Sequence, residues 1–257
     1  MITQKSDKEI ELLREGGRRL GRVLGALSRE VRPGRNIADL DRLAYTMITE
    51  AGDAPAFLNY RPQGADRPYP ASVCISINDE IVHGIPTEGE KVLREGDIVT
   101  LDTGIIHEGL VTDSAVTVGV GAISEEATLL LTATERGLYA AIDVVRAGIH
   151  VGDIGAAIEE VAKSSHLAIY RELVGHGVGY SVHEDPYIPN FGKKGAGSIL
   201  KAGTVIAIEP MFGLGTEEII LEADGYTYSS ADGSLSAHFE HTIVVTEDGA
   251  EILTSRS

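Results

Sequence analysis

The sequence predicts an α+β protein with a largely antiparallel sheet covered by helices. Helix-like and strand-like segments follow one another without the regular spacing of βαβ units, which disfavours a doubly wound parallel sheet. Residues 95–113 carry apolar and β-branched residues on both sides of His107-Glu108-Gly109, a pattern typical of a β-hairpin. We expect the chain to be organised around this hairpin.

Capping signals and turn residues set the other expected elements. Ser6 and Glu9 form a capping box that opens a helix, and Pro33-Gly34 ends it. A second helix follows over 36–52 and a long loop over 53–71. Further helices are expected over 124–147 and 153–165, and strands over 72–77, 168–174, 204–209, 217–221 and 237–246.

Composition excludes several classes of function. The chain has 257 residues, of which 43% are hydrophobic and 24% charged, as is ordinary for a soluble globular protein. Its net charge of −17 opposes attraction to nucleic acid and to anionic membranes. A single cysteine, Cys74, allows no intramolecular disulfide, and no apolar stretch resembles a signal peptide or a membrane span. We expect a cytoplasmic monomer.

Two carboxylates stand in the apolar strands of the hairpin. A two-residue loop at His107-Glu108 would place Asp102 directly opposite Asp113, with Cβ atoms ~5 Å apart. Two like charges so close in a half-buried sheet repel and lose hydration, so a divalent metal ion is the expected compensation. For the hairpin alone, the alternative is that either aspartate faces solvent or pairs with an arginine.

An internal regularity suggests two weakly similar halves. Residues 93–102 align with residues 200–209 at a constant offset of 107, and Arg32-Pro33-Gly34 resembles Arg146-Ala147-Gly148. We expect one catalytic domain over residues 1–257. It would consist of two pseudo-symmetric halves, about 1–120 and 121–257.

A pseudo-twofold axis between the halves would gather four carboxylates. Asp102 and Glu209 would occupy equivalent places. Asp113 and Glu240 would do so too, since each precedes a β-branched strand. Two divalent cations would neutralise the four negative charges, which predicts a two-metal centre. His176, between two glycines that allow close backbone approach, is the candidate nitrogen ligand, and a buried structural histidine is the alternative.

Several motifs occur together and in order. They are Cys74-Ile75-Ser76-Ile77-Asn78, His83-Gly84-Ile85-Pro86, Asp102 with Asp113, Gly175-His176-Gly177-Val178-Gly179 with His183, Ile208-Glu209-Pro210-Met211, and Phe239-Glu240-His241-Thr242. Together they resemble the type I methionine aminopeptidases, which have the pita-bread fold. The resemblance covers nearly the whole chain, from the first helix to Glu251.

The resemblance implies a metal-dependent enzyme that removes the N-terminal methionine from peptides and newly made proteins, with preference for a small second residue. Asp102 would chelate one of two metal ions, and Asp113 and Glu240 would bridge both. His176 and Glu209 would complete the second site. Such ligands suit Mn²⁺, Fe²⁺ or Co²⁺, with Zn²⁺ as a further candidate. A hydroxide shared by the metals would attack the scissile carbonyl.

The resemblance also implies roles for acid–base and substrate-binding residues. Glu209 would carry a proton from the attacking water towards the leaving amine. His183 would donate a hydrogen bond to the oxyanion, and His83 would contact the substrate amide or amine. The alternative is that Glu209 is a metal ligand without a role in proton transfer and that His83 and His183 are structural. The pocket for the methionine side chain would be lined by Phe57, Tyr60, Tyr69, Cys74, His83 and Tyr226. The alternative is that the aromatic residues among them belong to the hydrophobic core.

Three positions depart from the family pattern. The rim segment from Arg61 to Pro68 is longer than usual. Val182 replaces an aromatic residue before His183, which would widen the pocket, and His238 stands where an amide is common.

Two rival functions and one partner stay open at this stage. An Xaa-Pro aminopeptidase or dipeptidase of the same fold usually has an extra N-terminal domain, whereas only about 70 residues precede the first core strand here. An inactive peptide-binding relative should lack metal ligands. The arginines of the first helix and of the turn after it form a solvated helix face or a surface for ribosome docking; they are Arg14, Arg18, Arg19, Arg22, Arg29, Arg32 and Arg35.

Overall fold

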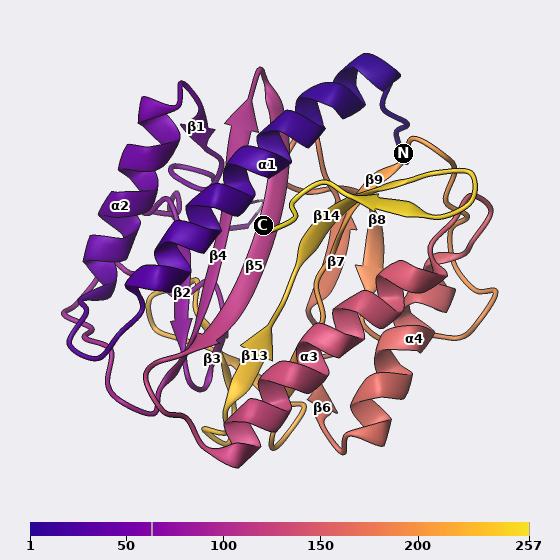
Figure 1. The fold of residues 1–257 in the computed structure, drawn as a ribbon. Helices are drawn as coiled ribbons and strands as arrows, with labels where there is room; N and C mark the ends of the chain where they lie inside the picture. The colour runs from indigo at the N-terminus through magenta and orange to yellow at the C-terminus, as the bar shows by residue number, and fades with distance from the viewer. Residues whose placement is uncertain (63, 257) are drawn as a thin grey trace.

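Two helix pairs cover a core of antiparallel strands in the computed structural model, which describes residues 1–62 and 64–256 (Figure 1). The first pair packs against strands of the N-terminal half and the second against strands of the C-terminal half. None of the helices in these two ranges is long and apolar enough to cross a membrane. The helices are α1 (Asp7–Glu30), α2 (Ile37–Glu50), α3 (Glu125–Val144) and α4 (Val151–Ser164).

The predicted hairpin is the centre of a four-stranded antiparallel sheet. Its first strand, β4, pairs with β5 on one side and with β1 and β2 on the other. The apolar and β-branched residues of β4 and β5 are nearly all buried, as the sequence pattern predicts. The strands are β1 (Ala54–Pro55), β2 (Cys74–Ile77), β4 (Ile98–His107) and β5 (Leu110–Gly119).

The predicted pairing of the two aspartates across the hairpin is wrong by two residues. Asp102 pairs with Ala115 instead of Asp113. The two-residue loop is Glu108-Gly109 and not His107-Glu108, because both loop residues have positive φ, 47° and 83°, as a type I′ turn requires. Side chains alternate with a period of two, so the shift keeps both carboxylates on one face of the sheet.

The C-terminal half forms a five-stranded sheet in the order β15-β14-β9-β7-β8, and the predicted α+β class is confirmed. Two further sheets have three strands each, β13-β10-β6 and β11-β12-β3. The expected strands over 168–174 and 237–246 each divide into two. The strands are β3 (Glu80–Val82), β6 (Ala168–Ile169), β7 (Val174–Gly177), β8 (Glu184–Pro189), β9 (Val205–Ile208), β10 (Met211–Gly213), β11 (Ile219–Leu221), β12 (Tyr228–Ser230), β13 (Ser236–His238), β14 (His241–Val245) and β15 (Ala250–Ile252).

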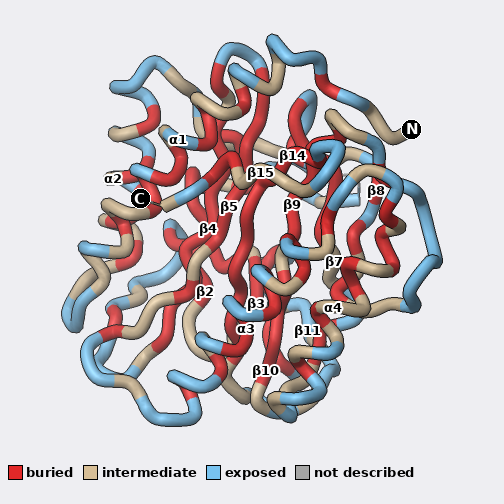
Figure 2. The backbone as a smooth tube through the Cα atoms, turned by 45° about the vertical axis from the view of Figure 1, so that its right-hand side comes forward, coloured by how far each residue is buried: buried red, intermediate tan, exposed pale blue. Residues whose placement is uncertain are grey.

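Hydroxyl side chains join the hairpin to the C-terminal sheet in what we call the β5–β14 seam. Thr242 Oγ1 donates to the Asp113 carbonyl at 2.7 Å and accepts from the Asp113 amide at 2.9 Å. Ser114 Oγ donates to the Glu240 carbonyl at 2.7 Å, and the Glu240 amide donates to the Ala115 carbonyl at 2.9 Å. Figure 2 shows buried residues concentrated along these central strands. The seam therefore fixes the backbones of Asp113 and Glu240 against each other.

Matching contacts at the ends of the two helix pairs support the predicted repeat. The Gly34 amide donates to the Leu93 carbonyl, and the Gly148 amide donates to the Leu200 carbonyl, both at 2.8 Å. Both glycines adopt positive φ, 83° and 86°. The division into two pseudo-symmetric halves within one catalytic domain stays a prediction that these contacts favour.

Glycines on α1 offer a test of how tightly this helix packs. A Cβ atom at Gly17 would overlap the backbone carbonyl of Leu253, so we expect Gly17→Ala to destabilise the fold by about 1–3 kcal/mol. At Gly25, an added Cβ would meet only Arg29 Nη1 at 3.6 Å. Gly25→Ala is therefore the matched control and should stabilise the helix by up to ~1 kcal/mol. Denaturant melts of both variants measure this, and equal effects would contradict the packing.

Candidate active site

Five side chains from both halves converge beside the β5–β14 seam. Asp102 lies on β4, Asp113 on β5 and His176 on β7, while Glu209 follows β9 and Glu240 lies between β13 and β14. Ligand atoms of Asp113, His176 and Glu240 lie within 4.8 Å of one another. Glu209 Oε1 lies 3.3 Å from His176 Nε2, and the carboxyl of Asp102 contacts that of Asp113. The structure thus brings together all five residues predicted as metal ligands.

The carboxylates of this cluster are buried with little compensation from the protein. Within residues 1–62 and 64–256, Asp102 Oδ1, Asp113 Oδ1 and Glu240 Oε1 are buried without a hydrogen-bond partner. Burial, followed by repulsion from Asp113, raises the pKa of Asp102, Glu209 and Glu240 well above the usual range. Burial also raises the pKa of Asp113 to about 7. Without added positive charge, these groups would bind protons near neutral pH.

His176 is oriented as a metal ligand usually is. Its Nδ1 lies 2.9 Å from the Gly177 carbonyl, which can only accept a hydrogen bond, so Nδ1 carries the proton. Burial lowers the pKa of His176 to about 3, so the ring is neutral and Nε2 has a free lone pair. That lone pair faces Glu209 Oε1, an unfavourable contact unless a cation or proton lies between them. A backbone carbonyl on the other ring nitrogen is the usual support for a ligating histidine.

These donors fit a divalent metal ion. Buried, unpartnered carboxylate oxygens and one neutral imidazole form an oxygen-rich set suited to hard or borderline divalent cations. A cation here would offset the repulsion that raises the carboxyl pKa values.

Two further histidines, His83 and His183, lie beside the cluster. The rings of His176 and His183 meet edge to face with centroids 4.5 Å apart. The Tyr60 hydroxyl lies 2.9 Å from His183 Nδ1. Burial, followed by the nearby His183, lowers the pKa of His83 to about 4. His83 also adopts a positive φ of 61°, a strained conformation for a residue other than glycine that is frequent at functional sites.

The predicted pocket residues gather beside the cluster. Tyr69 and Tyr226 meet edge to face with centroids 5.2 Å apart, and Cys74 pairs with Asp102 across β2 and β4. Val182, which stands where the family pattern has an aromatic residue, is buried in the same apolar group as Tyr69, Cys74 and Tyr226. The His183 side chain is partly open to solvent. Neighbouring atoms nevertheless exclude water from part of the ring, and this loss of hydration lowers the pKa of His183. The apolar group includes Phe57, Tyr69, Cys74, Val182 and Tyr226, and Tyr60 packs against it.

The rim segment from Arg61 to Pro68, of which residue 63 lies outside the described residues, is tied to the pocket. Arg67 pairs with Glu88 and donates from Nη2 to the Asp224 carbonyl at 3.0 Å. The Tyr226 hydroxyl donates to the Arg67 carbonyl. The long rim therefore borders the side-chain pocket through Tyr226.

His238, which departs from the family pattern, lies at the cluster. His238 is buried, and its Nε2 lies 3.6 Å from Glu209 Oε2. In the described part of the chain neither ring nitrogen has a hydrogen-bond partner. Its position two residues before Glu240 was the available signal, because it places the two side chains on one face of an extended segment.

Comparisons with known proteins agree with this site. Residues 11–247 match the model of metallopeptidase family M24. A methionine aminopeptidase of Aquifex aeolicus is 46% identical over 253 residues, which cover 97% of each chain. Methionine aminopeptidase 1 of Mycobacterium tuberculosis is 40% identical over 260 residues, covering 99% of this chain and 95% of that protein.

Solved structures give the same result for the fold. The crystal structure of a methionine aminopeptidase from Thermotoga maritima superposes with a TM-score of 0.94 at 40% identity, covering 99% of this chain and all of that one. An Xaa-Pro dipeptidase from Bacillus anthracis reaches a TM-score of 0.76 at 20% identity, and the match covers 98% of this chain and 62% of that one. The likeness to the dipeptidase shows the fold alone, which is the predicted pita-bread fold. The chain therefore belongs to metallopeptidase family M24 and groups with its methionine aminopeptidases.

Proposed function

We propose that this protein removes the N-terminal methionine from peptides and newly made proteins, preferring a small second residue. The observation that carries the proposal is the convergence of five candidate ligand side chains beside an apolar, aromatic pocket. The near full-length relatives named methionine aminopeptidases support it. An acidic cavity attracts the α-ammonium of a peptide, and aromatic rings suit the methionine thioether, at ~0.3–1.5 kcal/mol for each sulfur–ring contact.

The proposed cofactor is a pair of divalent ions, Mn²⁺, Fe²⁺ or Co²⁺, with Zn²⁺ as a further candidate. Asp102 would hold one ion, and Asp113 and Glu240 would bridge both. His176 and Glu209 would complete the second. When bound, such ions polarise a carbonyl and make a water acidic enough to attack near neutral pH.

The protein's own side chains would carry protons and orient the substrate. Glu209, whose carboxyl lies at the cluster 3.3 Å from His176 Nε2, would take a proton from the attacking water and pass it to the leaving amine. The Tyr60 hydroxyl would donate to His183 Nδ1, which leaves the proton of the neutral ring on Nε2 for the substrate oxyanion. His83, kept neutral by burial, would contact the substrate amide or amine.

We infer that the enzyme acts as a cytoplasmic monomer. Ribosome docking through the arginine-rich face of α1 stays a prediction. Within that face, Arg14, Arg18 and Arg19 pair with carboxylates of the same chain, and Arg32 and Arg35 both pair with Glu30. These ion pairs reduce the charge that the face presents to an anionic partner and favour a solvated surface.

Peptide assays test the substrate class. With metal, we expect release of methionine from Met-Gly and Met-Ala peptides and no cleavage of the same peptides after N-acetylation, because acetylation removes the ammonium. Amino-acid analysis of the products measures this. Cleavage of an Xaa-Pro peptide together with failure on Met-Ala would instead support the proline-directed alternative, and binding without any cleavage would support the inactive one.

Glu209→Gln tests the proton transfer. The amide cannot accept the proton, so we expect turnover to fall by about 10²- to 10⁴-fold. Metal content, measured by atomic emission on the purified protein, should stay close to that of the wild type. Unchanged turnover would remove Glu209 from the mechanism.

Melting temperatures at two pH values test the charge balance of the cluster. After chelation, the folded protein holds protons on the raised carboxyls, including Asp113 with its pKa of about 7, while the unfolded chain releases them near pH 4. The contribution of Asp113 to the free energy of unfolding therefore falls as the pH rises from about 4 through about 7, and the contribution of the other raised carboxyls also falls with rising pH. Since metal competes with protons, added Mn²⁺ should raise the melting temperature more at pH 8 than at pH 5. If the melting temperature is the same with and without chelator at both pH values, the carboxylates do not form a metal-binding cluster.

A further inference from the structure

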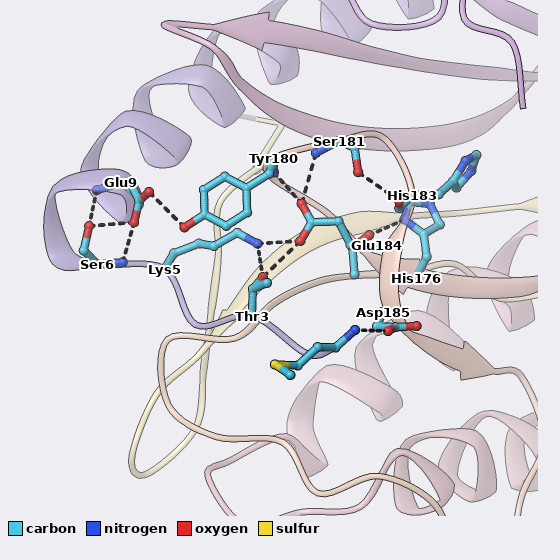
Figure 3. A network of polar contacts seen from close by, with 12 residues as sticks. Thr3, Lys5, Ser6, Glu9, His176, Tyr180, Ser181, His183, Glu184 and Asp185 are labelled. Atoms are coloured by element: carbon cyan, nitrogen blue, oxygen red, sulfur yellow. Dashed lines mark hydrogen bonds and ion pairs between the residues drawn. The ribbon is translucent and has the colours of Figure 1, made fainter.

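A buried ion pair ties the N-terminal segment to the loop that carries His183. Lys5 Nζ lies 2.8 Å from Glu184 Oε2, and their side chains are only 1% and 11% exposed. Lys5 Nζ also donates to Thr3 Oγ1 at 2.6 Å and lies 4.1 Å from the centre of the Tyr180 ring. Figure 3 shows this network, which spans 179 residues of sequence between Lys5 and Glu184. Removing one partner of such a buried pair is strongly destabilising, because it leaves the other charge buried without compensation.

Glu184 uses both carboxylate oxygens to hold two segments together. Its Oε2 accepts from Lys5 and from Thr3 Oγ1 at 3.0 Å. Its Oε1 accepts from the backbone amides of Tyr180 and, at 3.0 Å, Ser181. The loop between β7 and β8 is thereby folded back onto Glu184, which directly follows His183.

The loop backbone is shaped to admit the lysine. A Cβ atom at Gly179, which has a positive φ of 135°, would lie 2.5 Å from Lys5 Cε. The last glycine of the Gly-His-Gly-Val-Gly motif therefore leaves the space that the lysine stem occupies. The Lys5 amide also donates to the Gly203 carbonyl at 2.7 Å, which fixes the segment next to the start of β9.

We propose that Lys5 is a positioning residue for His183, acting through Glu184. The inference rests on the role of His183 in the proposed function. Ser181 Oγ donates to the His183 carbonyl at 2.9 Å, so the geometry that Glu184 imposes on Ser181 passes to the histidine backbone. From the other side, the Tyr60 hydroxyl contacts the ring. The imidazole is thus held by Tyr60 on one side and, through Glu184, by the N-terminal segment on the other, although neither Lys5 nor Glu184 belongs to the proposed metal ligands.

A double-mutant cycle on turnover tests the coupling. Lys5→Met keeps the apolar stem and removes the charge, and we expect kcat on a Met-Ala peptide to fall by about 10- to 100-fold with little change in KM. His183→Ala should lower kcat by about 100-fold. In the His183→Ala background, Lys5→Met should cause no further loss, because its effect passes through the missing ring. The same fold-loss in both backgrounds would overturn the proposal, as would wild-type kcat in Lys5→Met or in His183→Ala.

A matched control separates this effect from loss of an ion pair in general. Lys163 pairs with Glu159 at 3.0 Å on α4. Lys163→Met should leave kcat and KM unchanged, and an equal loss of kcat there would contradict a specific role for Lys5. If Lys5→Met does not fold, Thr3→Val removes one hydrogen bond from Glu184 and should give a smaller loss of kcat, again absent in the His183→Ala background.

A readout that does not need turnover separates this proposal from the function itself. In ¹⁵N spectra of histidine side chains, we expect one fixed tautomer of His183, with the proton on Nε2, in the wild type and in Lys163→Met. Lys5→Met should show averaging between the two tautomers. A fixed tautomer in Lys5→Met would overturn the proposal even if the peptide assays succeed. Averaging in Lys5→Met alone would support it even if no methionine were released.

Discussion

The hydroxyl hydrogen bonds of the β5–β14 seam are the constraint on which the site depends. β5 and β14 belong to different sheets, and Thr242 and Ser114 connect them through the backbones of Asp113 and Glu240. These two residues are the ones proposed to bridge both metal ions. A shift along the seam would separate ligands that must lie within a few ångströms of each other, so the register between the halves and the chemistry of the site are set by the same contacts.

The same arrangement makes the site unfavourable without a cation. Four buried carboxylates repel one another and lose hydration, and three of their oxygens have no partner among the described residues. Such a cluster lowers the stability of the metal-free protein, since buried charge without compensation is costly. Its presence in an otherwise well-packed core indicates that metal binding is part of the folded state. The neighbouring histidines are kept neutral by burial, which suits ligation and hydrogen-bond donation rather than charge.

Local signals in the sequence predict much of this molecule. The capping box at Ser6, the turn at Gly34 and the apolar periodicity predict α1 and its end closely, because helix limits depend on nearby residues. Carboxylates in apolar strands predict the cluster, because their burial demands compensation. The pairing of Asp102 was missed by two residues, since it depends on which two residues of the turn adopt positive φ. The face was still correct, because the strand period of two is insensitive to that shift.

Contacts between distant segments could not be predicted in this way. Tyr60 meets His183 across 123 residues, and Lys5 meets Glu184 across 179 residues. Nothing in the local pattern of either partner indicates the other, because such contacts depend on the packing of the complete chain. The tertiary structure therefore adds the orientation of the side chains to a set of candidate ligands that the sequence predicts.

The central claim is that the five converging side chains form a metal centre. Anomalous X-ray diffraction from crystals grown with saturating Mn²⁺ tests it most directly. Two manganese peaks are expected, both within bonding distance of Asp113 and Glu240 and one of them also next to His176. Full occupancy elsewhere on the protein with no peak at these residues would contradict it.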